Sequence, residues 1–259
     1  MGLFSKQRSD FLGRRAYMAH VNGNRLYDAG KPNEAQPKHE QARQLYEQAF
    51  DQGCERVAYL MAYGVLMLRF REYDKARAAF LKAESNKALT KDERKQLRIN
   101  FAIAQWKLGQ LDSAIEQLEI AAQDGKNAML YGSMGYILIE KAAQTGDFER
   151  ALAFNREAYD YDEDDAIVLD NMGQLHLHMG MRDEALGYFR RAHERKPNQV
   201  DTLYYLAKLA LEDGERDAAL EYLSTALNGN FSALSTITLE QAQALLEEAE
   251  AVGAKKGDE

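Results

Sequence analysis

The sequence predicts an all-α protein built from repeated helix pairs, and three observations lead to this prediction. Alanines and apolar residues recur at helical spacing in a pattern that repeats every 34 to 38 residues. Glycines stand at corresponding places in these repeats, both in turns and inside helical patterns. The chain has only 3 prolines in 259 residues, while the helix-favouring residues Ala, Leu, Glu, Lys and Arg are plentiful. A period of this length indicates a helical repeat array.

The alanine motif is the main periodic signal. An alanine is followed four residues later by a bulky or apolar residue, and another alanine follows three residues further on. The first alanines are spaced 34, 38, 37, 34 and 34 residues apart, and Asn155 is the one polar residue at the bulky position. The six copies are Ala42, Tyr46, Ala49; Ala76, Phe80, Ala83; Ala114, Leu118, Ala121; Ala151, Asn155, Ala158; Ala185, Phe189, Ala192; and Ala219, Leu223, Ala226.

Turn glycines precede most copies of this motif by five residues. They are Gly109, Gly146, Gly180 and Gly214, and Arg71 takes their place in the second copy. A glycine at this point is typical of a helix end, because it adopts the left-handed backbone conformation without strain.

A second set of small residues lies in the middle of the upstream helices. Gly64, Gly135 and Gly173 occupy corresponding places, and Ala102 and Ala207 occupy the same place in other copies. A glycine inside a helix costs about 1 kcal/mol relative to alanine. We therefore expect these positions to be sites where two helix backbones approach each other closely.

Together these residues resemble the tetratricopeptide repeat family, as a multi-repeat scaffold of the bacterial type, over roughly residues 16–233. The resemblance implies a right-handed α-solenoid in which the first helix of each pair lines a concave groove. The fifth copy carries it most clearly, through Leu169, Met172, Gly173, Gly180, Ala185, Phe189, Ala192 and Pro197.

We expect four parts along the chain: a basic and apolar segment over 1–15, six repeats over 16–233, a capping helix over 234–252 and a polar tail over 253–259. A terminal repeat exposes an apolar face, and such a face needs a cap with a polar outer side. The approximate repeat bounds are 16–56, 57–90, 95–127, 128–165, 166–199 and 200–233.

Three departures from a regular repeat are expected at helix ends. The first copy should have a turn that is longer by seven residues and carries Pro32 and Pro37. Four extra residues precede the third copy, around Leu89 to Glu93. The first helix of the fourth copy should be about one turn longer, continuing through Ala143.

Composition argues against several functional classes. The net charge of −8 disfavours general binding to nucleic acid. Cys54 is the only cysteine, so no internal disulfide can form. The uncharged run 57–68 is too short to span a bilayer, and no signal peptide is recognisable, so we expect a cytoplasmic protein.

No catalytic, cofactor or metal site is predicted. Phosphate-binding loops, dinucleotide fingerprints, serine nucleophile motifs and zinc motifs are missing from the sequence. His176 and His178 are two apart, so on a helix they point in different directions; we expect His176 in the core and His178 beside the groove. The acidic run 160–165 is expected to be a loop whose last carboxylates cap the next helix.

The sequence predicts a groove that binds a protein or peptide, apolar in its first half and polar and aromatic beyond. The apolar stripe leaves two alternatives, burial by tight curvature or coverage by a partner or the chain's own tail. Trp106 is either a binding hot spot or a structural wedge. The candidate groove residues are Met61, Val65, Leu68, Ile99, Asn100, Ile103, Trp106, Tyr136, Asp170, Asn171, Gln174, His178, Tyr204, Tyr205 and Lys208.

The segment 1–15 combines four basic residues with one acidic residue and several apolar ones, including Phe11. It could dock on an acidic neighbour, touch a membrane surface or lie in the chain's own groove, or be a disordered tail. The leading function is a non-catalytic scaffold. The alternative is a structural subunit that self-associates into a homo-oligomer.

Overall fold

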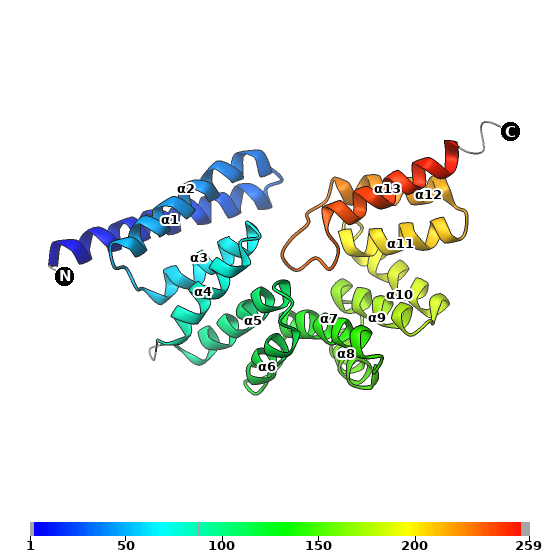
Figure 1. Cartoon of the computed structure of the whole chain (residues 1–259), viewed down its shortest axis with the longest axis horizontal. Helices are drawn as coiled ribbons and strands as arrows, with labels where there is room; N and C mark the ends of the chain where they lie inside the picture. The colour runs from blue at the N-terminus through cyan, green and yellow to red at the C-terminus, as the bar shows by residue number, and fades with distance from the viewer. Residues whose placement is uncertain (1–2, 87–88, 255–259) are drawn as a thin grey trace. The chain divides into compact units, whose positions relative to one another are not determined.

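The computed structural model describes residues 3–86 and 89–254, and these residues form 13 α-helices and no β-strand (Figure 1). The predicted all-α fold class is therefore confirmed. The chain divides into two compact units, Met1–Asp124 and Gly125–Glu259. Most of the predicted polar tail, from residue 255 onward, lies outside the described residues.

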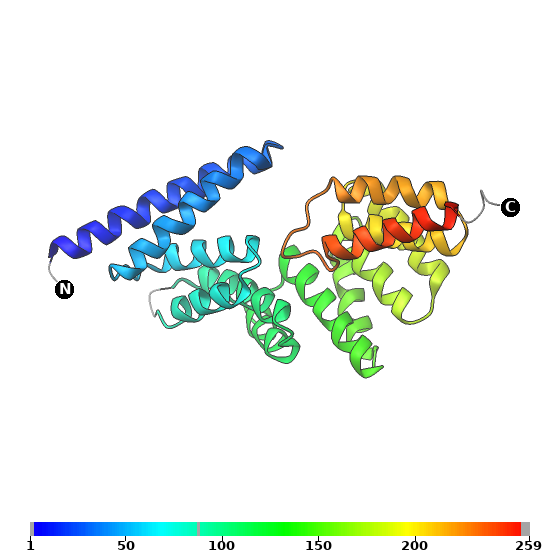
Figure 2. The ribbon, with the colours of Figure 1, turned by 45° about the horizontal axis from the view of Figure 1, so that its top comes forward.

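Unit 1 is a stack of three antiparallel helix pairs, α1 with α2, α3 with α4 and α5 with α6 (Figures 1 and 2). The bounds of these helices are α1 Leu3–Asp28, α2 Pro32–Asp51, α3 Val57–Arg69, α4 Tyr73–Glu84, α5 Lys91–Lys107 and α6 Leu111–Ala122.

Unit 2 is a second stack of three helix pairs, to which the single helix α13 is added against α12. A long connection, orange in Figure 1, joins α12 to α13. The bounds are α7 Ala128–Thr145, α8 Glu149–Tyr161, α9 Ala166–His178, α10 Arg182–Arg195, α11 Val200–Glu212, α12 Arg216–Leu227 and α13 Leu239–Ala254.

Helices of a pair meet where a small residue faces a large one. A Cβ placed on Gly64 would lie 2.4 Å from the Phe80 ring, and one on Gly173 would lie 2.6 Å from the Phe189 ring. Both phenylalanines are fully buried. Ala207 packs in one core cluster with Leu223, a smaller partner than phenylalanine. The mid-helix glycines are therefore explained by the size of the side chain that each one faces.

The pair α7 and α8 uses a polar contact at the same place. Asn155 is completely buried, and its Nδ2 donates hydrogen bonds to the carbonyl oxygens of Gly135 at 3.2 Å and Ala151 at 2.9 Å. A Cβ on Gly135 would lie 2.5 Å from the Asn155 side-chain oxygen. The polar residue therefore fits because its amide group is bonded to the backbone of both helices.

Helix ends follow the expected chemistry. Thr90 and Glu93 form a capping box at the start of α5, and Asp165 accepts hydrogen bonds from two backbone N–H groups at the start of α9. The turn glycines have positive φ, for example 77° at Gly146 and Gly214. Arg71 adopts φ 58° at the corresponding turn, a conformation that costs a side-chain-bearing residue about 1 kcal/mol or more.

Two expectations about the first pair were wrong. The turn after α1 is short, because α2 begins at Pro32 and includes Pro37 within the helix. The additional residues extend α2 along α1, where the His39 ring packs on Gly23. In addition, α1 begins at Leu3, so residues 3–15 continue into the first repeat helix. The expected longer helix in the fourth pair is confirmed by α7, which spans 18 residues.

Candidate partner-binding surfaces

The predicted groove residues of unit 2 lie together on its first helices, α7, α9 and α11. Asp170 and Gln174 of α9 are buried, and Tyr136 of α7 is half-buried. Gln174 and Tyr136 contact a segment of the chain that the sequence did not assign to the groove. This segment, residues 228–238 between α12 and α13, is called the closing segment below.

Asp201, in the first turn of α11, holds the closing segment by its backbone. Its Oδ1 accepts hydrogen bonds from the Thr236 N–H, from the Ile237 N–H at 3.1 Å and from the Thr236 hydroxyl at 2.7 Å. Gln174 Nε2 donates to the Thr236 hydroxyl oxygen at 3.2 Å. The Tyr136 hydroxyl also hydrogen-bonds with Thr236. Three first helices thus bind one short stretch of main chain and one hydroxyl.

A buried polar network lies next to these contacts and includes Gln174, which takes part in both. Asp170 accepts a hydrogen bond from the Thr202 hydroxyl and another from Gln174 Nε2, each at 2.6 Å. Burial raises the pKa of Asp170 to about 7, and the nearby Asp201 carboxylate acts in the same direction. Two acidic groups in one buried network favour protonation of one of them, because both charges together are costly to bury.

The other predicted groove residues of unit 2 have mixed positions. Asn171 is buried, and its Nδ2 donates a hydrogen bond to the Gly132 carbonyl oxygen at 3.0 Å. This hydrogen bond joins α9 to α7. Tyr204 and Tyr205 are half-buried, with their rings 5.4 Å apart. Lys208 is exposed and His178 partly exposed, and the partial burial of the His178 ring together with the Lys208 charge lowers the pKa of His178. His176 is buried against Tyr188, as expected.

In unit 1, the predicted groove residues of α5 are buried within the fold. Ile99, Asn100, Ile103 and Trp106 all have exposed fractions of 7% or less. Of the two alternatives for the apolar stripe, deeper packing therefore applies to α5. In this structure these four side chains do not form an accessible binding surface.

The stripe on α3 is different because part of it reaches the surface. Val65 is 40% exposed and Met61 is half-buried, whereas Leu68 is only 5% exposed. Tyr17 and Val21 on the neighbouring helix α1 are 44% and 45% exposed. These four residues, Tyr17, Val21, Met61 and Val65, are called the apolar strip below.

Two ring contacts fix how α1 and α3 lie side by side on this face. The rings of Tyr17 and Tyr59 are 6.4 Å apart, and the Arg69 guanidinium lies 4.3 Å from the centre of the Tyr27 ring. Each contact joins residues that are 42 apart in sequence. The intervening Val21 therefore lies beside the part of α3 that carries Met61 and Val65.

Charge separates the two units. Residues 1–124 contain 20 Lys and Arg against 16 Asp and Glu, whereas residues 125–259 contain 13 against 25. The overall acidity of the chain is therefore a property of unit 2, and unit 1 is mildly basic. Its α1 also carries exposed Phe11, which was expected in a separate N-terminal segment, and exposed Met18, which was not predicted as a site residue. The seven-residue spacing between Phe11 and Met18, which places both on one side of a helix, was the available signal.

Within residues 3–86 and 89–254, no three or more His, Cys, Asp and Glu side chains are grouped so that they could hold a metal ion. None of the helices in this part of the chain combines the length and the apolar character needed to span a membrane.

Comparison with known proteins places the repeats in a family. Two models described as tetratricopeptide repeat match the chain, one over residues 20–89 and 99–166 and the other over residues 176–232. No curated protein sequence matches the chain.

Solved structures resemble the chain in fold. A thermophilic TPR protein of Thermus thermophilus has a TM-score of 0.63 and 19% identity, with 76% of this chain and 100% of that chain covered. PilW, a widely conserved type IV pilus biogenesis factor, has a TM-score of 0.60 and 18% identity, covering 89% and 98%. A chain of the APC/C hetero-tetramer Cut9–Hcn1 has a TM-score of 0.58 and 16% identity, covering 90% and 46%.

Proposed function

The chain belongs to the tetratricopeptide repeat family, and we propose that it is a non-catalytic scaffold whose apolar strip binds a protein segment. The observation that carries this proposal is the exposure of Tyr17, Val21 and Val65, which are 40–45% exposed on adjacent first helices. Large apolar side chains gathered on one face mark an interaction site more often than scattered ones do.

The strip fits a protein ligand with apolar side chains. Tyr17 and Tyr59 supply flat aromatic area, and Met61 is a flexible side chain that adapts to different shapes. Exposed Arg69, stacked on Tyr27, places a positive charge at one end of the strip. A segment with apolar residues and a carboxylate at one end would therefore complement both features.

The closing segment shows that first helices in this chain can bind a segment of polypeptide on this face. In unit 2, side chains of the first helices hold a non-helical stretch of main chain through Asp201 and Gln174. The same face of unit 1 has a different, apolar surface. We infer that a partner segment binds the first helices of unit 1 in the way that the closing segment binds those of unit 2.

Site-specific photocrosslinking in the native cell tests the proposal. A benzophenone amino acid at Val65 should give a protein adduct, while the same residue at Leu81 should not. Leu81 is a matched control because it is 54% exposed and lies on the second helix α4. Once the partner is known, Val65→Asp should weaken its binding by about tenfold, or about 1.4 kcal/mol.

Equal adducts from Val65 and Leu81 would contradict the proposal. Adducts that consist solely of a second copy of the chain would instead support the self-associating structural subunit. Size measurements across a range of concentrations would then show an oligomer that Val65→Asp dissociates.

A further inference from the structure

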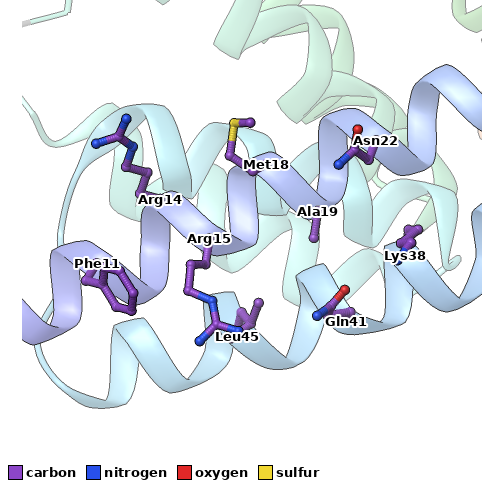
Figure 3. A pocket seen from close by; sticks show the side chains of 9 residues that line it. All are labelled: Phe11, Arg14, Arg15, Met18, Ala19, Asn22, Lys38, Gln41 and Leu45. Atoms are coloured by element: carbon purple, nitrogen blue, oxygen red, sulfur yellow. The ribbon is translucent and has the colours of Figure 1, made fainter.

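A second surface of unit 1 lies between α1 and α2, whereas the apolar strip lies between α1 and α3. It is an open groove of about 390 Å³ in which Arg15 and Ala19 of α1 point toward Leu45 and Gln41 of α2, while Arg14 and Met18 stand on the outer side of α1 (Figure 3). Phe11 and Met18 of α1 and Leu45 of α2 form its apolar part. Phe11 is 61% and Met18 58% exposed, so they are less covered than the residues of the apolar strip. This surface is called the end groove below.

The end groove lies on the free side of the first helix pair. On its opposite side, α1 contacts the next pair, since Gly13 approaches the Tyr59 ring and Asp10 pairs with Arg56. The groove therefore occupies the place where a preceding helix of the stack would pack. At the other end of the array, α13 covers the last pair with Leu245 and Ala249 in the shared core. No described helix does this for α1 and α2.

The charged side chains that line the end groove are all positive. Arg14, Arg15 and Lys38 line it, and none of the described side chains that line it is acidic. Within the described part of the chain these three cations are exposed and make no ion pair; Arg15 lies over the Phe11 ring with its charge 5.7 Å from the ring centre. The groove thus combines uncovered apolar side chains with three uncompensated positive charges.

We propose that the end groove binds an acidic amphipathic helix of a partner protein, which packs on α1 and α2 as an additional helix of the stack. The lining of α1 extends from Phe11 to Asn22, about 16 Å at 1.5 Å per residue, which is the length of three helical turns. The apolar side of such a helix would cover Phe11, Met18 and Leu45. Its carboxylates would reach the three cations on both rims.

The charge pattern also decides between this partner and others. Two copies of the chain joined through the same groove would bring Arg14, Arg15 and Lys38 against their own counterparts, which is unfavourable. A membrane surface could meet the cations. It would not fill a hollow between two helices, where side chains of a packed helix would interlock.

The proposal concerns a surface separate from the apolar strip and does not depend on the proposed function. It is tested with the full chain and a fluorescent peptide of about 18 residues, with leucines at helical spacing and glutamates on both flanks. A twin peptide carries lysine in place of each glutamate. The acidic peptide should bind at least about tenfold more tightly than its twin, and added salt should weaken it.

Substitutions locate the binding. Met18→Glu should weaken the acidic peptide by at least about tenfold, while Leu81→Glu, at an exposed position of α4, should leave it unchanged. Circular dichroism checks that helicity is retained. Lys38→Glu provides an independent change on α2, so the conclusion does not rest on α1 alone.

The proposal would be overturned by equal affinity for both peptides, by binding that is unaffected by both Met18→Glu and Lys38→Glu, or by tighter association with vesicles of phosphatidylcholine and phosphatidylserine than with the acidic peptide. Self-association of the chain that Met18→Glu abolishes would overturn it as well. Crosslinking from Val65 should persist in Met18→Glu. A failure of the end-groove proposal would therefore not contradict the proposed function of the apolar strip.

Discussion

The two units are built from the same kind of helix pair, but they differ in charge and in what lies on their first helices. Unit 1 is mildly basic and exposes Tyr17, Val21 and Val65 on one face and Phe11 and Met18 on another. Unit 2 is strongly acidic, carries its own closing segment on the corresponding helices and is capped by α13. Unit 2 covers these surfaces with its own chain, whereas the described residues of unit 1 leave the corresponding surfaces exposed.

This difference indicates where partners should bind. An array of stacked repeats has exposed apolar surface at its ends and along its first helices, and this surface must be covered by the chain itself or by something else. In unit 2 the chain itself supplies this cover, because Asp201 holds the closing segment on the first helices and α13 packs on the last pair. In unit 1 the described residues do not, which makes it the unit in which binding proposals are best tested.

The largest expected effect tests whether the two units share the same helix packing and differ only in their surfaces. Gly173→Leu should destabilise unit 2 by about 3 kcal/mol, because its side chain would collide with the Phe189 ring. Gly64→Leu should cost unit 1 a similar amount against Phe80. Urea unfolding followed by circular dichroism measures both changes.

Gly187 provides the matched control for that prediction. A Cβ at this helical position meets nothing within 4 Å, so Gly187→Leu should be neutral or slightly stabilising. The combination Gly173→Ala with Phe189→Leu recreates the pairing of Ala207 with Leu223. This double variant should therefore be less destabilised than Gly173→Leu. Unchanged stability in Gly173→Leu would show that close helix contact does not hold the pairs together.

The next prediction is that the two units respond to acid in opposite directions. Burial and nearby positive charge lower the pKa values of His20 and His39 in unit 1 to about 4. Because the unfolded histidines take up protons that the folded ones do not, unit 1 should lose stability as pH falls below about 6.5. In unit 2 the folded Asp170, with a pKa of about 7, binds a proton that the unfolded form does not, so acidification through that range should add stability.

Local probes can separate these responses. Trp106 is the only tryptophan, so its fluorescence follows unit 1, while hydrogen exchange of the α9 and α11 amides follows unit 2. Each change should be on the order of 1 kcal/mol between about pH 7 and about pH 5. Asp170→Asn should remove the gain in unit 2, where the lowered pKa of His178 acts in the opposite direction, and should leave the trend of unit 1 unchanged. Parallel trends in both units would contradict the assignment.

The smallest expected effect concerns a strained turn in unit 1. Arg71 stands at positive φ where four later turns have glycine, so Arg71→Gly should stabilise the protein by up to about 1 kcal/mol. The reverse change, Gly214→Arg, should destabilise unit 2 by a similar amount. Melting temperatures of both variants measure this, and a loss of stability in Arg71→Gly would mean that contacts of the arginine outweigh the strain.

Local patterns were sufficient to predict much of the fold. The repeating alanines and glycines predicted the helix pairs, because close helix contact depends on side-chain size at single positions such as Gly64 and Gly173. Asp165 as a helix cap and the longer α7 were also predictable, since both depend on neighbouring residues. Pro37 misled the prediction because tertiary contact along α1 stabilises a helix that local propensity disfavours.

The sequence by itself determined the repeat, its period and the residues where helices touch, because these depend on short-range spacing. Only the tertiary structure decided which stripe residues are accessible, burying Ile99 and Ile103 while leaving Val65 exposed. It also brought Thr236 to Asp201, 35 residues away in sequence, and opened the groove between α1 and α2. Exposure and such contacts depend on how whole helices stack, which the spacing of residues within one helix does not specify.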